Sequence, residues 1–101
     1  MSRICIVVEF TPKPGCHDAL AAHMRQHAQA TLTEEPGCER FDVMQPLGED
    51  GQPDATKLVL VEVYADMNAV RAHRANPRMP VVAEGSKRLL EGRRLSLCAM
   101  D

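Results

Sequence analysis

Runs of apolar residues and stretches with helical spacing alternate along the chain. Residues 3–10 are apolar and rich in β-branched side chains, and prolines and a glycine follow within residues 11–15, which predicts a first strand and its end. Residues 14–34 carry β-branched side chains only near their end and predict a long helix. Pro36 and Gly37 favour a helix end, so we expect this helix to stop just before them.

The second half of the chain predicts the remaining elements. Residues 38–45 alternate loosely and residues 58–64 are almost wholly apolar, so they predict an antiparallel hairpin with a long loop. Asp66 is a typical N-cap for the helix that follows it. A further helical segment over residues 78–90 and a last strand over residues 93–100 complete the pattern.

The order of these elements indicates a known arrangement. Strand, helix, strand, strand, helical region and strand form a split βαβ unit, in which a four-stranded antiparallel sheet carries the helices on one face. We therefore expect an α+β, ferredoxin-like fold. The length of 101 residues suits a single domain over residues 1–101.

The two most apolar strands predict a partner. In a monomer, a sheet with helices on one face should present alternating apolar and polar residues, because its other face meets water. Residues 3–10 and 58–64 are instead apolar on both faces. Because no further element is left to cover the second face, we expect a homodimer that packs sheet against sheet, with Val59, Val61 and Val63 in the contact.

Composition narrows the class of protein. The chain has 12 Lys and Arg against 14 Asp and Glu, without a charged block, which disfavours nucleic acid and anionic membranes as partners. No apolar run approaches the roughly 18 residues of a membrane helix, and the N-terminus does not resemble a signal peptide. The 4 cysteines are scattered. We therefore expect a cytoplasmic protein with free thiols.

Polar side chains lie beside the apolar stripe of the long helix. His23, His27 and Thr31 are four residues apart and form one row at the edge of that stripe. In the strand over residues 58–64, Glu62 and Tyr64 share a face with leucines, and this face should look toward the helices. A convergence of such groups in an apolar setting predicts a small-molecule pocket.

A buried carboxylate needs partners, and the histidines are available. Because burying an unpaired Glu62 is costly, we expect His23, His27 or His73 beside it. The other interpretations are a half-exposed surface histidine, a pairing of Glu62 with Arg40, and a core tyrosine with a wet hydroxyl.

A metal site is the less favoured interpretation of the same residues. His23 and His27 have a ligand spacing and Glu62 could complete a triad. No helical general base accompanies the pair, since Met24 stands where H-E-x-x-H has its glutamate and position 26 is Gln26. We expect no metal.

Three segments resemble the antibiotic biosynthesis monooxygenase domain family. They are residues 33–45, 58–66 and 69–77, with the family's P-G-C, R-F-D-V, E-x-Y and A-x-x-x-H patterns in order. The resemblance implies a dimeric α+β barrel and the oxidation of a quinol-like or aromatic small molecule without metal, flavin or other cofactor.

The resemblance also implies roles for the polar residues. His27 or His73 would take the phenolic proton, since imidazole changes charge near neutral pH. Arg40 or Tyr64 would stabilise the resulting oxyanion. Glu62 would join the catalytic group. The substrate would be bound by His23, Thr31, Arg40 and Phe41.

Other activities occur on similar chains. The isomerase of a phosphorylated bacterial autoinducer is close in pattern, although His27 stands where that relative has Asn. Haem-degrading relatives also place a histidine where His73 lies, but they tend to use a Trp and this chain has none. A small-molecule-binding stress dimer without turnover is the non-enzymatic alternative, because a fold does not determine function.

Overall fold

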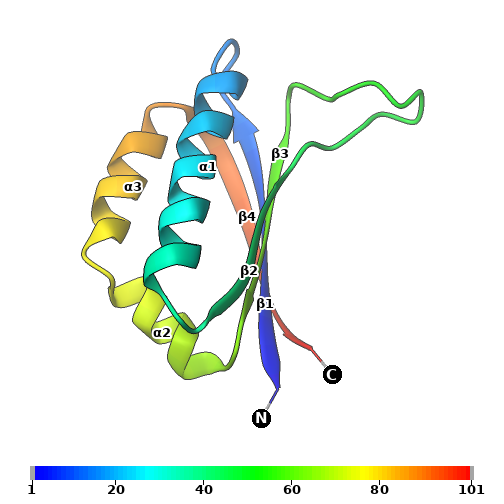
Figure 1. The fold of residues 1–101 in the computed structure, drawn as a ribbon. Coiled ribbons are helices and arrows are strands. Elements are labelled where there is room, and N and C mark those ends of the chain that lie inside the picture. Colours follow the sequence, from blue (N-terminus) through cyan, green and yellow to red (C-terminus); the bar gives the residue numbers. More distant parts are fainter. Residues whose placement is uncertain (1, 101) are drawn as a thin grey trace.

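Seven elements make up the fold in the computed structural model, which describes residues 2–100. In chain order they are β1 (Arg3–Pro12), α1 (His17–Glu34), β2 (Cys38–Met44), β3 (Leu58–Tyr64), α2 (Met67–Ala75), α3 (Arg78–Lys87) and β4 (Leu90–Met100). The strands form one antiparallel sheet in the order β2-β3-β1-β4. All three helices cover the same face of this sheet (Figure 1). The prediction of an α+β, ferredoxin-like fold is confirmed.

Two element boundaries differ from the sequence prediction. The long helix begins at His17 rather than at residue 14, because Gly15 adopts a positive φ of 78° that a helix does not allow. The last strand begins at Leu90 rather than at residue 93. The reason is that β1 runs on past a register shift to Pro12, which pairs with Leu90.

The strand register separates an inner from an outer face. Along β1, even-numbered residues from Ile4 to Phe10 are buried against the helices, while odd-numbered residues such as Val7 face the opposite side. Ile6 lies between Glu62 of β3 and Leu97 of β4. The inner face therefore carries both the apolar core and the carboxylate of β3.

The helices cover the inner face unevenly. From α1, buried side chains such as Leu20 and Met24 join the core, whereas α3 buries only Ser86. On β4, Leu95 and Leu97 belong to the inner face but remain 44% and 45% exposed. The inner face is thus open where α3 meets β4.

The connection between β2 and β3 projects away from the helices (Figure 1). A bridge between Leu47 and Pro53 holds its two sides together, and the Gln45 amide donates to the carbonyls of Pro46 and Asp54. Leu47 is 61% exposed on this arm. Among residues 2–100, no helix is long and apolar enough to cross a membrane.

Candidate functional site

A pocket of about 750 Å³ lies between the helices and the inner face of the sheet. Its walls are mostly apolar and include Val8 and Phe10 of β1 and Val82 of α3. His27, Glu62 and His73 line its polar part. An apolar cavity with a few convergent polar groups is the usual form of a small-molecule site.

Glu62 lines the pocket, and Tyr64 lies behind it on the same strand, outside the residues that form the pocket wall. Both side chains project from the inner face of β3 and are buried. The Tyr64 hydroxyl donates a hydrogen bond of 2.7 Å to Oε1 of Glu62. Burial raises the pKa of Glu62, although the Tyr64 hydrogen bond and His73 act in the opposite direction. Burial and the Glu62 carboxylate raise the pKa of Tyr64, so this residue stays a neutral phenol and serves as a donor.

His73 connects the pocket to a second carboxylate. Its Nδ1 atom lies 2.8 Å from Oε1 of Glu35, and its Nε2 atom lies 3.9 Å from Oε1 of Glu62. With Glu35 ionised, Nδ1 donates the proton, and the carboxylate holds the ring in one orientation and one tautomer. The arrangement leaves Nε2, on the pocket side of the ring, free to exchange a proton.

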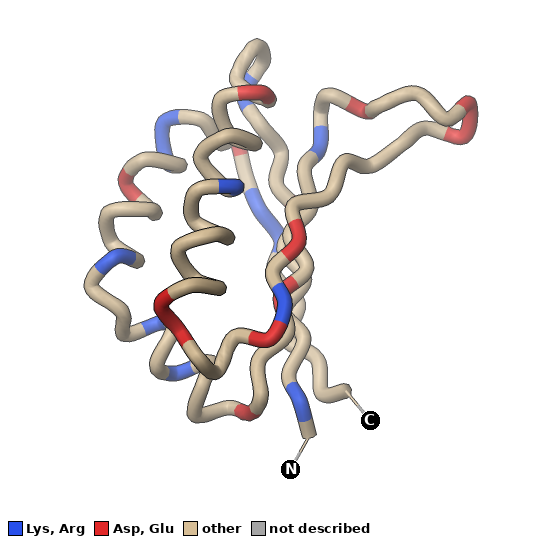
Figure 2. Tube along the Cα trace, in the orientation of Figure 1, with Lys and Arg blue, Asp and Glu red and all other residues tan. Residues whose placement is uncertain are grey.

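Arg78 holds Glu35 in place. Its Nη2 group donates to Oε2 of Glu35 and, over 3.0 Å, to the Thr31 hydroxyl, while Nη1 donates to Oε1 of Glu34 over 3.1 Å. The Thr31 hydroxyl in turn donates to the carbonyl of His27. Figure 2 shows the acidic end of α1 facing the basic α2–α3 region. Glu35 is therefore shared between a guanidinium and an imidazole.

His27 is buried beside His73, with ring centroids 5.4 Å apart. Its ring also makes a nearly perpendicular contact with the ring of Phe41, at 5.3 Å between centroids. Within the described residues, the buried Nδ1 atom of His27 has no hydrogen-bond partner. Such an atom is costly to bury, which makes it a candidate for contact with a ligand.

The stability of the fold should depend on pH through His27. Burial, with the nearby charges of His73 and Arg78, lowers the pKa of His27 from 6.5 to about 4. Between these two values the unfolded chain takes up a proton at this residue and the folded chain does not, so stability falls as pH falls through this window.

Urea unfolding of the wild type and of His27→Leu from pH 7 to pH 4 measures this effect. Glu62 is present in both chains, and its contribution therefore largely cancels in the comparison. We expect the free energy of unfolding of the wild type to fall relative to that of the variant as the pH decreases. A difference that stays constant across the window would contradict the assignment to His27.

The remaining predicted site residues have different surroundings. His23 is half-buried on α1, where its Nε2 group donates to the carbonyl of Val82 on α3. A Cβ atom at Gly85 would lie 2.6 Å from Cε1 of His23, so the glycine makes room for this ring. His23 thus joins two helices and is not among the polar groups that line the pocket.

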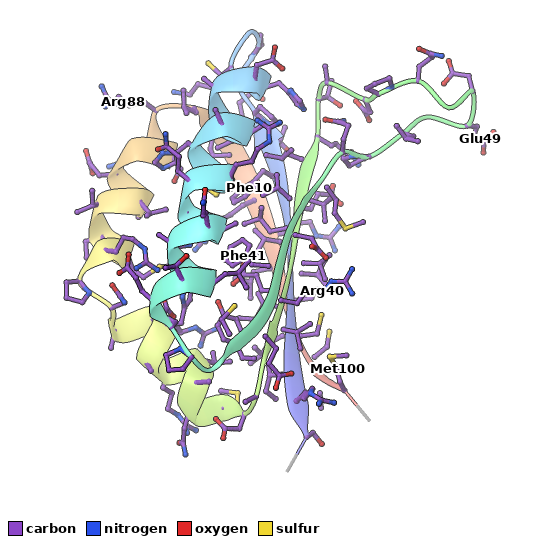
Figure 3. All side chains as sticks on the ribbon, in the orientation of Figure 1. Phe10, Arg40, Phe41, Glu49, Arg88 and Met100 are labelled. Atoms are coloured by element: carbon purple, nitrogen blue, oxygen red, sulfur yellow. The ribbon has the colours of Figure 1, made fainter. Side chains whose placement is uncertain are left out.

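Arg40 and Phe41 point to opposite sides of the sheet (Figure 3). Phe41 is buried on the inner face beside His27. Arg40 is exposed on the outer face, where its Nε group donates to Asp42. The alternative pairing of Glu62 with Arg40 is wrong, because β-strand alternation places the two side chains on different faces.

The sequence analysis did not identify two residues that contribute to the site. Glu35 lies between the last residue of the predicted helix and Pro36, and Arg78 directly follows the Asn76-Pro77 break. Charged residues at such boundaries are typical of exposed turns. The sequence feature that could have pointed to this contact is the pair of acidic residues at positions 34 and 35, because two adjacent carboxylates favour a nearby cation.

Cys38 and possible metal ligands add no reactive group. Cys38 is buried, its thiol donates weakly to the carbonyl of Arg40, and burial raises its pKa to about 11. Its thiol therefore stays protonated at neutral pH. Within residues 2–100, no three His, Cys, Asp or Glu side chains are arranged to hold a metal ion.

The sequence matches the model of one known protein family. The model of the family described as antibiotic biosynthesis monooxygenase matches residues 3–84. A search of the curated proteins gives no match.

Solved structures share the fold over nearly the whole chain. A protein from Mycobacterium tuberculosis is 26% identical with a TM-score of 0.81, covering 99% of this chain and 96% of its own. A protein from Pseudomonas aeruginosa is 20% identical with a TM-score of 0.83, covering 100% and 96%. A protein from Caulobacter crescentus, named as a candidate antibiotic biosynthesis monooxygenase, is 17% identical with a TM-score of 0.86, covering 99% and 91%.

The family match spans most of the chain and includes the strands and helices that carry His27, Glu62 and His73. The resemblance noted from the sequence is confirmed. The chain belongs to the antibiotic biosynthesis monooxygenase family.

Proposed function

We propose that the protein is a cofactor-independent monooxygenase that oxidises a quinol-like or aromatic small molecule in the pocket beneath α1 and α3. The observation that supports this most is the position of His73. Its ring is fixed by Glu35 on one side and faces a mostly apolar cavity beside Glu62 on the other. An oriented base in an enclosed apolar site is what oxidation of a phenolic anion requires.

The proposed reaction balances without a redox cofactor. Nε2 of His73 takes a proton from the substrate, and the resulting carbanion or phenolate gives one electron to O2. Superoxide and the substrate radical then combine at carbon to a peroxide anion, and the proton on Nε2 of His73 returns to it, which gives the hydroperoxide and restores the base. Loss of water converts a CH2 group into a carbonyl, so that one oxygen atom enters the product and the other leaves as water.

The other polar groups support this step. Tyr64 donates to Glu62 and keeps that carboxyl group at the pocket base. His27 is neutral at physiological pH because its pKa lies near 4, so it suits hydrogen bonding to substrate or oxygen better than proton abstraction. Arg40 faces the other side of the sheet, and we assign it no contact with the substrate. Thr31 acts on the site through Arg78.

Oxygen uptake with a panel of quinols and anthrone-type aromatics tests the proposal. We expect His73→Gln to lower kcat by about a hundredfold or more, as for loss of a general base. His17→Gln is the matched control, since His17 lies at the start of α1 and contacts Gln45 outside the pocket. Circular dichroism must show both variants folded. Uptake unaltered in His73→Gln and in His27→Ala would reject the proposal.

A second candidate function rests on Glu62 and His73. A carboxyl group with a raised pKa lies 3.9 Å from an imidazole nitrogen, and such a pair can move a proton between neighbouring carbons of a ketose phosphate. Isomerisation continues under strict anaerobiosis, whereas oxygenation stops. The same panel, extended with ketose phosphates and repeated without oxygen, separates the two.

We also propose that the chain forms a homodimer through the outer face of the sheet and resides in the cytoplasm. The outer face presents valines, Met44 opposite Val59 and Met100 opposite Arg3, and the two methionines are 48% and 41% exposed. The four cysteines are free thiols, which suits a reducing compartment.

A non-catalytic binding dimer is less favoured, since the Glu62 carboxylate accepts a hydrogen bond from Tyr64 beside the pocket and does not pair with Arg40.

A further inference from the structure

The pocket has a second charged region at the end opposite to the acid and base groups. Lys87, from the last turn of α3, and Arg93, from the start of β4, both line it. Within residues 2–100, neither takes part in an ion pair. Figure 2 shows basic positions on either side of the turn between α3 and β4. We call Lys87 and Arg93 the basic end of the pocket.

The strand register fixes the direction of Arg93. Arg93 is paired with Phe10, whose side chain is buried on the inner face, so Arg93 points toward the helices and into the pocket region. Glu91 also lines this end. Two cations and one carboxylate leave a net positive charge at the mouth of an otherwise apolar cavity.

Arg74, the third cationic side chain that lines the pocket, lies near a buried carboxyl group. Arg74 follows His73 on α2, and its charge acts on the buried Glu62 carboxyl. Arg74 therefore offsets a carboxylate of the protein. Lys87 and Arg93 have no such buried carboxylate to offset, so they are available to a ligand.

The distance between the two ends sets the length of that ligand. Glu62 lies opposite Ile6 and Arg93 lies opposite Phe10, on the two sides of β1. Ile6 and Phe10 are separated by about 13 Å along the strand. The walls between them are apolar, with Val8, Leu60 and Val82 among the lining residues.

From this layout we propose that the ligand of the pocket is an elongated aromatic compound with an oxyanion, such as a carboxylate, bound at Lys87 and Arg93, and with its reacting group at His73 and Glu62. The inference rests on the proposed function, because it places the substrate of that function in this pocket. A guanidinium and an ammonium at one end of an apolar cavity select for an anion through charge-assisted hydrogen bonds. They also fix which end of the ligand meets the base.

Fluorescence titration with two matched probes tests this inference. Anthracene-2-carboxylate carries the anion, and 2-(hydroxymethyl)anthracene is its neutral analogue. We expect the carboxylate to bind about tenfold more tightly, with an advantage that shrinks as salt is added. Lys87→Gln combined with Arg93→Gln should remove most of this advantage and leave the affinity for the alcohol unchanged.

Neighbouring residues provide the control. Arg88→Gln combined with Arg94→Gln removes the same charge, but Arg88 projects away from the body of the molecule (Figure 3) and Arg94 lies opposite Glu9 in the strand register, on the outer face. This double variant should keep the preference for the carboxylate. An equal loss in both double variants would overturn the inference, because it would reflect net charge alone.

The remaining outcomes separate this inference from the proposed function. Equal affinity of the wild type for the two probes overturns the anion preference while leaving an aromatic-binding pocket, which the oxygen-uptake assay then tests by itself. Failure of both probes to bind overturns the anion preference and removes the pocket that the proposed function needs.

Discussion

Replacing Glu35 with alanine is expected to lower the free energy of unfolding by about 3 kcal/mol, the usual size for breaking a buried ion pair by removing one partner. Glu35 is the acceptor for both Arg78 and His73. Without it, a mostly buried guanidinium and a buried imidazole lose their common carboxylate. Urea unfolding at pH 7, followed by circular dichroism, measures the loss.

The neighbouring glutamate provides a matched control for this variant. Glu34 also contacts Arg78, but its side chain is 60% exposed, against 12% for Glu35. Glu34→Ala should therefore cost less than about 1 kcal/mol, as is typical of surface ion pairs. Equal losses in the two variants would show that helix-end electrostatics, rather than the buried network, sets the stability.

Val61→Lys is expected to convert the proposed dimer into monomers, with a rise in the dissociation constant of about a hundredfold or more. Val61 lies at the centre of the outer face, between Val7 of β1 and Asp42 of β2. A dimer that packs sheet against sheet would bury a lysine there without a matched partner. Sedimentation velocity over a range of protein concentrations measures the association.

Val81→Lys controls for the added charge. Val81 is 70% exposed on α3, on the side of the molecule away from the outer face of the sheet (Figure 1). This variant should sediment as the wild type does. A wild type that is monomeric at every concentration, or a Val61→Lys protein that still associates, would contradict the proposed interface.

Sequence periodicity was sufficient to predict which face of its strand or helix each of three buried polar residues occupies. Alternation along β3 places Glu62 and Tyr64 on the inner face, and helical spacing places His27 beside the apolar stripe of α1. These assignments depend only on local geometry, which residue order determines. The fold class follows from the same signals, because the order of strands and helices limits the topologies available.

Contacts between distant segments could not be predicted in this way. Glu35 and Arg78 are 43 residues apart, and their pairing requires α2 and α3 to fold back against the end of α1. His23 illustrates the same limit, since its role depends on Gly85 of another helix. Side-chain pairing of this kind is set by tertiary packing, for which a single sequence carries little local signal.

The weak burial of α3 divides the molecule into a closely packed part and a loosely packed part. The polar residues to which we assign proton transfer stand on the sheet, α1 and α2, whose side chains form the core, whereas α3 buries one residue among those described. Substitutions on its pocket side therefore reshape the chamber at small thermodynamic cost. If the proposed function holds, changes on this side of α3 should therefore alter which molecules fit the chamber while the polar groups on the opposite wall keep their positions.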